Sequence, residues 1–390
     1  MDKKKRIGII TFSNTKDNYG QVLQYLATQD YLDGRGHETF LFIPQGHKVT
    51  IWNRLVHKTK KIGKKILKFL PAGLTDKESD ALTRPLSISA LDEQKQSLFE
   101  RWAVITEWNE KQHPRHFGDF RRSFFHTHSC YYEDLKDVYA FAIGSDQMWS
   151  YISEDTMLSF VRGNIKRFSI APSVGHKVFN EDEIKIAAPA LAKFDFITVR
   201  EQNGLDFCKA CGRIDAHLVL DPTFLIPKKS YQKYANLQRI QVPKRYVMIY
   251  MLGGEIEPSI EDMFKWAKER ELEVVYVASQ GRDDEHPKCY ATVEQWLALL
   301  QNAEYVFTNS YHGMALSVIY HKQFITFPLI GLMEGMNGRI VQLAENFSLQ
   351  GRIYQGDLNA VTKQIDWEIA EKTIEKNINL LDKLLKTVDL

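Results

Sequence analysis

The N-terminal segment carries the pattern that most restricts how this chain can fold. An apolar run from Arg6 to Thr11 is typical of a buried strand, and the segment that opens at Asn18 has apolar residues at helical spacing. Gly34 ends that helix, and Glu38 to Ile43 gives a second strand. Strand, helix and strand in this order form a βαβ unit, whose strands lie parallel. The sequence therefore predicts a parallel sheet covered by helices.

Further strands are predicted downstream, and each ends in polar or glycine-bearing residues. Val138 to Ile143 is followed by Gly-Ser-Asp-Gln, Arg167 to Ala171 by Pro-Ser-Val-Gly, Phe194 to Val199 by Arg-Glu, and His217 to Leu220 by Asp-Pro-Thr. Open parallel sheets bind ligands beyond the carboxyl ends of their strands. These polar segments mark the place where we expect a site.

A second set of strands and helices follows residues 227–244, which are typical of a linker. Strands are predicted over residues 246–252, 272–278, 303–308 and 323–327, and helices over 258–270, 292–301, 312–320, 334–347 and 366–388. The predicted fold class is α/β, with two Rossmann-like doubly wound domains facing a cleft. We place the N-terminal domain in residues 1–226 and the C-terminal domain, with its last helix, in residues 227–390.

Composition and charge exclude several classes of protein. The 390 residues carry a net charge of only +2, which argues against a partner nucleic acid, and four cysteines are too few for a disulfide scaffold. No apolar run approaches the about 20 residues that a transmembrane helix needs. The first residues lack the pattern of a signal peptide, so we expect a cytoplasmic protein.

Residues 54–70, RLVHKTKKIGKKILKFL, are basic and contain no acidic residue. In a helix, Leu55, Ile62, Ile66 and Phe69 fall near one face. Such a helix can lie on an anionic membrane surface, which predicts peripheral contact with the inner face of the cytoplasmic membrane. The alternative is a solvated basic face that packs through its apolar stripe.

Six short motifs occur in the order in which one known family carries them. They are NYGQVLQ (18–24), IGSDQMWS (143–150), SVG (173–175), VRE (199–201), LDPTFL (220–225) and TNSYHG (308–313). Through them the chain resembles the polysaccharide pyruvyl transferase family, and GSDQMW and NSYHG are the most telling pieces. The resemblance implies the two-domain architecture of the glycosyltransferases called type B.

The resemblance also implies a reaction. Characterised members of the family move the pyruvyl group of phosphoenolpyruvate onto a sugar as a ketal. The implied partners are phosphoenolpyruvate, as co-substrate, and a hexose of a surface polysaccharide or of its precursor, which can be linked to polyprenyl diphosphate. The N-terminal domain is the implied acceptor side and the C-terminal domain the implied donor side.

The motif TNSYHG lies at a strand-to-helix junction and supplies the predicted acid, His312. The unperturbed pKa of histidine is close to neutrality, which suits proton donation. The N-terminus of the following helix offers N–H groups and a positive dipole end to an anion. We therefore predict that Asn309, Ser310 and Gly313 bind the donor. The alternative is a histidine that caps the helix and has no catalytic role.

Two arginines are the predicted donor-binding cations. Many members of the family carry an arginine two residues before the histidine, where this chain has Ser310. Arg200 follows a strand and can grip a carboxylate or phosphate with two hydrogen bonds. Arg339 lies early in a helix and can replace the missing cation from the second domain. The alternatives are an ion pair of Arg200 with Glu201 or Asp221, and a solvated Arg339.

The acceptor side is predicted from the first two motifs. Asp146 is the predicted base for a sugar hydroxyl, with an N-cap role as the alternative. Trp149 can stack on a sugar face, or can belong to the core. Asn18, Tyr19 and Gln24 are the other predicted acceptor-binding residues. The spacing GxGxxG is absent there, so a dinucleotide site is not expected.

We expect no metal and no cofactor. Cys208 and Cys211 have CxxC spacing but fall at the end of a predicted helix, and no second pair lies near them. His126 and His128 alternate along a predicted strand without further ligands nearby. The turn that begins at Asp221 is interpreted as structural.

Two other functions stay open at this point. The first is a nucleotide-sugar-dependent glycosyltransferase of the same architecture. The second is a non-catalytic relative that binds sugar or phosphate, which the serine at position 310 favours.

Overall fold

The computed structural model describes residues 4–12, 14–47, 90–175, 178–238 and 240–390. The basic helix predicted over residues 54–70 lies outside these ranges. In the described part, no helix is both long and apolar enough to cross a membrane.

The N-terminal half contains a sheet of parallel strands in the order β3-β2-β1-β4-β5. The strands are β1 (Arg6–Ile10), β2 (Glu38–Pro44), β3 (Thr127–Cys130), β4 (Ala140–Ile143) and β5 (Lys166–Ser169). A bridge between Phe168 and Phe196 leads to the pair β6 (Thr198–Val199) and β7 (His217–Leu218). The order of the strands reverses between β1 and β4, which makes a topological switch point there.

The C-terminal half contains a second parallel sheet, in the order β11-β10-β8-β9. Its strands are β8 (Tyr246–Tyr250), β9 (Glu273–Tyr276), β10 (Tyr305–Thr308) and β11 (Gln323–Thr326). The switch point of this sheet lies between β8 and β10. Two doubly wound sheets confirm the predicted fold class, and each predicted strand forms, shorter than expected in most cases.

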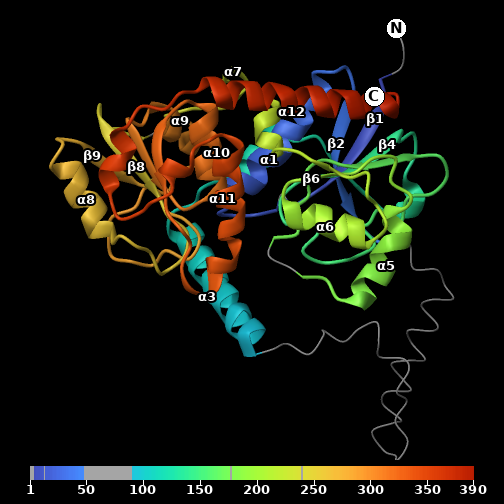
Figure 1. The fold of residues 1–390 in the computed structure, drawn as a ribbon, viewed down its shortest axis with the longest axis horizontal. Helices are drawn as coiled ribbons and strands as arrows, with labels where there is room; N and C mark the ends of the chain where they lie inside the picture. The colour runs from blue at the N-terminus through green and yellow to red at the C-terminus, as the bar shows by residue number, and fades with distance from the viewer. Residues whose placement is uncertain (1–3, 13, 48–89, 176–177, 239) are drawn as a thin grey trace, which may run out of the picture.

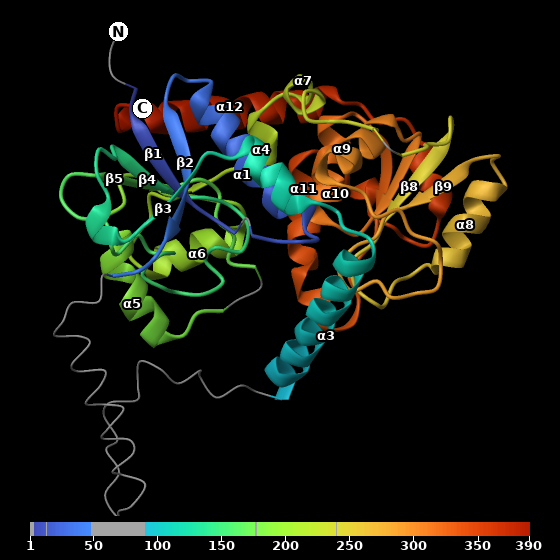
Figure 2. The ribbon, with the colours of Figure 1, turned by 180° about the vertical axis from the view of Figure 1, so that it is seen from behind.

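Helices cover both sheets (Figures 1 and 2). They are α1 (Tyr19–Asp33), α3 (Ala90–Gln112), α4 (Phe117–Phe124), α5 (Glu181–Leu191), α6 (Gln202–Ala210), α7 (Lys228–Gln232), α8 (Ile260–Lys268), α9 (Val293–Asn302), α10 (Tyr311–Ile319), α11 (Asn337–Asn346) and α12 (Glu368–Thr387). Short 3-10 turns, η3 (Pro222–Leu225) and η4 (Gly331–Met336), precede α7 and α11.

Helix α3 starts at Ala90 and was not among the helices predicted from the sequence. The helix extends away from the body of the protein (Figure 1). Among its described side chains only Trp102 and Asn109 are buried.

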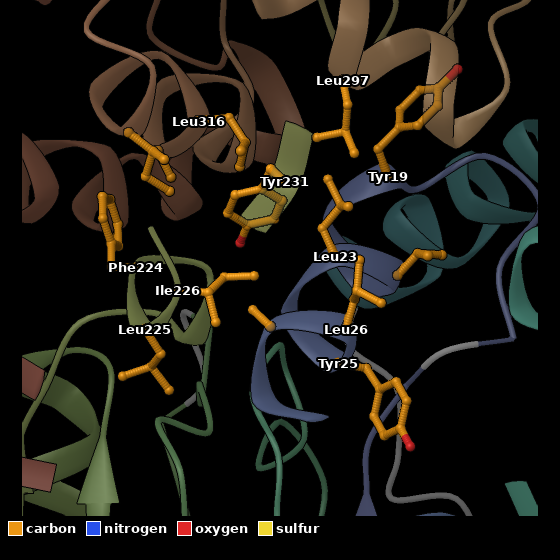
Figure 3. Close-up of a cluster of buried hydrophobic side chains, with 14 of the residues drawn as sticks. Tyr19, Leu23, Tyr25, Leu26, Phe224, Leu225, Ile226, Tyr231, Leu297 and Leu316 are labelled. Carbon is orange, nitrogen blue, oxygen red and sulfur yellow. The ribbon is translucent and has the colours of Figure 1, made fainter. Parts of the chain in front are cut away.

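Helix α1 joins the two halves through one continuous core. The ring of Tyr19 stacks on Trp296 of α9, with centroids 4.9 Å apart, and its hydroxyl donates to the carbonyl of Ala291 at 2.7 Å. Figure 3 shows Leu23 of α1 close to Leu297 of α9 in the same buried cluster. Apolar side chains surround most of α1, as expected of a helix enclosed on all sides.

Helix α12 runs across both halves (Figures 1 and 2). It belongs in sequence to residues 227–390, but it completes the hydrogen bonding of the N-terminal half. The side chain of Asn377 accepts from the backbone N–H of Leu220 at 2.7 Å. Beyond the helix, the carbonyl of Val388 accepts from the hydroxyl of Tyr139 at 3.0 Å. The division at residue 226 stays a prediction.

Candidate functional site

A cleft of about 430 Å³ lies between the two halves, at the carboxyl ends of both sheets. Asn18 and Asp146 line it from the N-terminal half, and Ser310, His312 and Arg339 line it from the C-terminal half. Asp146 follows β4 and His312 follows β10, so both lie next to the switch points of their sheets. This is where an open α/β sheet binds its ligands.

Asp146 presents an uncommitted carboxylate to the cleft. Its backbone has a φ of 65°, in the left-handed region that non-glycine residues rarely adopt. The strained turn is held by its carbonyl, which accepts from the N–H groups of Met148 and Ser173, both at 2.7 Å. Its side chain makes no hydrogen bond with a described residue, so Asp146 is not the helix cap that was its alternative interpretation.

His312 lies in the first turn of α10 and is only 8% exposed. Its Nε2 is 3.5 Å from Oδ2 of Asp221 and has no hydrogen-bond partner among the described residues. The imidazole packs against the backbone of Gly20 in α1: a Cβ placed on Gly20 would lie 1.9 Å from Nδ1. Residues from three separate segments therefore fix the position of this ring. The helix cap is provided by another residue, so His312 is not a capping histidine.

Asp221 is the carboxylate that lies behind this histidine, and it is fully buried. Oδ2 accepts from Nη1 of Arg200 at 2.7 Å and from Oγ of Ser145 at 3.1 Å, while Oδ1 accepts from Thr223 N and Oγ1. Burial alone would raise the pKa of this carboxyl, but His312 and Arg200 hold the pKa of Asp221 well below its usual range. Asp221 therefore does more than start a turn, which is all that we predicted from the sequence.

Arg200 lies behind the cleft and does not line it. Its guanidinium bonds to Asp221 and, through Nε at 3.3 Å, to Glu201, and it lies 4.6 Å from the ring centroid of Tyr311. Burial opposes the charge, but the two carboxylates raise the pKa of Arg200, so it stays cationic. Arg200 therefore forms the ion pairs that were its alternative interpretation.

Arg339 lines the cleft as predicted, and it differs from Arg200 in having no acidic partner. No carboxylate of the described residues lies within ion-pair distance of it. Among the same residues, its buried Nε finds no hydrogen-bond partner, and its Nη2 donates to the sulfur of Met336 at 3.0 Å. Burial and the nearby Arg200 lower the pKa of Arg339. A half-buried guanidinium without a counter-ion makes the cleft favourable for an anion.

The start of α10 is built by three residues that we predicted to bind the donor. Oγ of Ser310 accepts from the N–H of Gly313 at 3.3 Å, which makes Ser310 the N-cap. The amide of Asn309 bonds to both the N–H and the carbonyl of Leu252, at 2.6 and 2.9 Å, and so joins the ends of β10 and β8. A Cβ on Gly313 would lie 2.4 Å from Oγ1 of Thr308. Asn309 and Ser310 line the cleft with side chains that are already engaged, whereas Gly313 lies outside its lining.

The predicted acceptor-binding residues separate into two groups. Asn18 lines the cleft and caps α1, accepting from Gln21 N at 3.2 Å. Tyr19, Gln24 and Trp149 are 0% exposed and lie outside the cleft. Gln24 donates to Oγ1 of Thr11 at 2.8 Å, and the indole of Trp149 donates to the carbonyl of Thr156 at 3.0 Å. These three side chains are too deeply buried for the predicted contacts with an acceptor. Trp149 belongs to the core, which was its alternative interpretation.

Other residues line the cleft without having been predicted. Gln21 and Gln147 belong to the first two motifs, so the signal was present in the sequence. Tyr250 ends β8, and Met333 and Met336 come from η4. Nothing in the sequence of η4 indicates that it returns to the carboxyl ends of both sheets.

No group of three or more potential metal ligands occurs among the residues that the structure describes. Cys208 and Cys211 are buried free thiols, and burial raises the pKa of Cys208 to about 12. His126 faces Asp33 at 3.6 Å, and His128 packs against Phe40.

The two doubly wound sheets and the cleft between them define a protein of two-domain, glycosyltransferase-B-like architecture. The model of the family described as polysaccharide pyruvyl transferase matches residues 18–329, which is most of the chain. The chain therefore belongs to the polysaccharide pyruvyl transferase family and is by class a transferase. No curated protein matches it in sequence.

Several solved structures are similar over nearly the whole chain. Arabidopsis thaliana UGT89C1 has 11% identity and a TM-score of 0.45, with 99% of this chain and 98% of that chain covered. The UDP-GlcNAc 2-epimerase of Methanocaldococcus jannaschii has 11% identity and a TM-score of 0.42, with 97% and 93% covered. The Neisseria meningitidis enzyme of the same name, bound to UDP-GlcNAc, has 8% identity and a TM-score of 0.42, with 99% and 94% covered.

Proposed function

We propose that this transferase moves the pyruvyl group of phosphoenolpyruvate onto two hydroxyls of a hexose and forms a ketal. The hexose belongs to a surface polysaccharide or to its polyprenyl-diphosphate-linked precursor. Family membership supports the reaction class, and the unpaired guanidinium of Arg339 in the cleft wall is the observation that carries the choice of an anionic donor.

The atoms of this reaction balance without a cofactor. One sugar hydroxyl adds to C2 of phosphoenolpyruvate, C3 takes up a proton and becomes a methyl group, and the C2–O bond to phosphate breaks. A second hydroxyl then adds to C2 and closes the ring. Two hydroxyl protons are released: one is balanced by the new C–H bond at C3, and the other leaves with phosphate or buffer.

His312 and Asp146 take the two proton-transfer roles in this proposal. His312 donates to C3 in this proposal, because its ring lines the cleft and is held in place by Asp221 and Gly20. Asp146 accepts a proton from the sugar hydroxyl, since its carboxylate reaches the cleft without another partner. The two groups come from opposite halves, so donor and acceptor meet between them.

Arg339 and the N-terminus of α10 hold the phosphate and carboxylate of the donor in this proposal. The first N–H groups of α10 precede its first intrahelical bond, and the helix dipole favours negative charge there. Arg200 acts from behind: it fixes Asp221 and adds positive potential to the cleft. Ser310 keeps its role as helix cap.

An assay with phosphoenolpyruvate or with nucleotide sugars, each with a panel of hexose-containing acceptors, tests the proposal. Phosphate release that depends on the acceptor, with a pyruvyl ketal in the product by mass spectrometry, is the expected result. Release of nucleotide from a nucleotide sugar would identify the glycosyltransferase alternative instead. Binding of either donor without turnover would identify a non-catalytic relative.

We also propose peripheral contact of residues 54–70 with the inner face of the cytoplasmic membrane. The basic composition of this segment is the support, and a lipid-linked acceptor would be found there. The protein should sediment with anionic liposomes at low salt and be released by high salt. No sedimentation at low salt would contradict this part of the proposal.

A further inference from the structure

A second cavity, of about 660 Å³, opens in the N-terminal half next to the central cleft. Phe12 and Gln21 line both spaces, so a ligand in the second cavity lies beside the cleft that Asp146 and His312 line. The cavity lies over the carboxyl ends of β1 and β2, where Thr11 and Pro44 line it. We call this space the side groove.

The side groove offers two aromatic faces and unused polar groups. Tyr151 is 44% exposed, and its ring centroid lies 5.8 Å from that of Phe12. The hydroxyl of Tyr151 and the amide of Gln21 make no hydrogen bond with a described residue. An exposed ring can cover the C–H face of a sugar, while amide and hydroxyl groups bond to its hydroxyls.

The charges of the side groove are already engaged, in contrast to the central cleft. Arg121 donates to the carbonyl of Thr15 at 2.6 Å and to Oδ1 of Asn14 at 3.3 Å, and Arg122 pairs with Asp119. Arg339 in the cleft has no such partner. The side groove therefore fits a neutral ligand better than a phosphate-bearing one.

We propose that the side groove binds neutral sugar residues of the acceptor glycan that neighbour the reacting hexose. Tyr151 stacks on one of these residues, and Gln21 holds the sugar at the junction with the central cleft. The acceptor is then an oligosaccharide rather than a free hexose. The identity of this ligand as an acceptor rests on the proposed function, whereas its binding does not require phosphoenolpyruvate.

Binding of neutral hexose oligosaccharides, from disaccharides to tetrasaccharides, to the full chain tests this proposal without turnover. Saturation-transfer NMR and calorimetry should show binding that Tyr151→Ala weakens about five- to tenfold and that Gln21→Ala also weakens. Tyr131→Ala is the matched control, because Tyr131 is similarly exposed, at 37%, on the same half but outside the groove. Binding of phosphoenolpyruvate should depend on Arg339 and be unchanged in Tyr151→Ala.

Three results would overturn the proposal. The first is that the wild type and both groove variants bind the oligosaccharides equally well, and the second is that no oligosaccharide of the panel binds. The third is that UDP displaces a bound oligosaccharide and that this displacement depends on Tyr151. Tyr151-dependent sugar binding by a protein that does not turn over phosphoenolpyruvate would support the side groove and contradict the proposed reaction. Tyr151→Phe should keep the stacking and lose only the hydroxyl contact.

Discussion

Arg200 is buried and Arg339 is half-buried, and the two arginines differ in whether a carboxylate lies within ion-pair distance. Arg200 bonds to Asp221 and Glu201, and it serves to build the site. Arg339 has a buried Nε without a partner and contacts a thioether. An unpaired charge that has lost part of its hydration destabilises a protein unless a ligand compensates for it. The difference supports the proposal that Arg339 makes the direct contact with the donor.

Replacing Arg339 should weaken binding of the donor without destabilising the fold. We expect Arg339→Met to raise the KM for phosphoenolpyruvate about tenfold or more, because a charge-assisted hydrogen bond is lost. The thermal midpoint should stay the same or rise, since the variant also removes a desolvated charge. Steady-state kinetics and differential scanning calorimetry check both expectations.

Arg339→Lys serves as the companion variant, because it keeps the charge and loses the planar fork. An intermediate KM is expected for it. A fall in the thermal midpoint of Arg339→Met with unchanged KM would instead give Arg339 a structural role.

Asp221→Asn should affect both chemistry and stability. The amide keeps an acceptor for Thr223 at Oδ1 but removes the charge that faces His312 and Arg200. We expect kcat to fall about a hundredfold, with a smaller change in KM. Removal of one partner from a buried ion pair should also cost about 3–5 kcal/mol in the free energy of unfolding.

The stability difference between wild type and Asp221→Asn should depend on pH. Because the pKa of Asp221 is lower in the folded than in the unfolded protein, the unfolded state binds more protons in acid. The contribution of Asp221 is therefore complete above its unfolded pKa of about 3.9 and is lost as the pH falls toward the folded value. Denaturant titrations between pH 7 and pH 3 should show the difference shrinking below about pH 4. A difference that grows in acid would contradict the assigned role.

At the scale of elements, the site depends on how closely α1 approaches α10. Gly20 in the first turn of α1 leaves room for the ring of His312 in the first turn of α10. Both helices start at a carboxyl end of a strand beside a switch point, one in each half. The ring of His312, the proposed acid, is therefore positioned by contact between the two halves.

Gly20→Ala should reduce activity without destabilising α1. Alanine favours a helix over glycine by about 1 kcal/mol, but its Cβ would overlap the imidazole of His312 and displace it. We expect kcat/KM to fall at least about tenfold while circular dichroism stays unchanged. Gly338→Ala in α11 is the control, because a Cβ there meets no atom within 4 Å, and it should leave activity unchanged. Full activity of Gly20→Ala would show that the ring can move without consequence.

The sequence was informative about elements and less so about the direction of side chains. His312 and Asp146 could be found because polar residues after apolar strands mark the carboxyl edge of a parallel sheet. Trp149 lies in the same motif as Asp146 but points into the core, and Gln24 lies in the same motif as Asn18 but is enclosed by α1 and β1. Which residue of a motif faces the cleft depends on how its helix or loop is rotated about its own axis. That rotation is set by packing in three dimensions and cannot be read from the motif.

At the scale of the molecule, one hydrophobic core cluster spans both sheets, and each half also has a cluster of its own. The core cluster runs from α1 through α9 and α10, with the stacked rings of Tyr19 and Trp296 at the contact. A large apolar contact of this kind links the stability of the two halves. The halves should therefore behave as one folding unit.

The fragment of residues 1–226 should not fold alone, although its sheet is complete in sequence. Without the C-terminal half, the apolar side chains of α1 would face water, and the partners of Tyr19 would be missing. We expect the fragment to be expanded or aggregated by size-exclusion chromatography, and the full chain to unfold in one calorimetric transition. Cooperative unfolding of the isolated fragment would instead establish independent domains.

The path of α12 has a consequence for how the protein is made. The backbone N–H of Leu220 and the hydroxyl of Tyr139, both in the N-terminal half, donate to Asn377 and Val388, which lie 157 and 249 positions later in the sequence. A ribosome synthesises α12 after both sheets, so the first half waits through the synthesis of the second with its packing unfinished. Nascent chains of this protein should therefore depend on chaperones until α12 has emerged, and a premature stop in this helix should be as damaging as one much earlier.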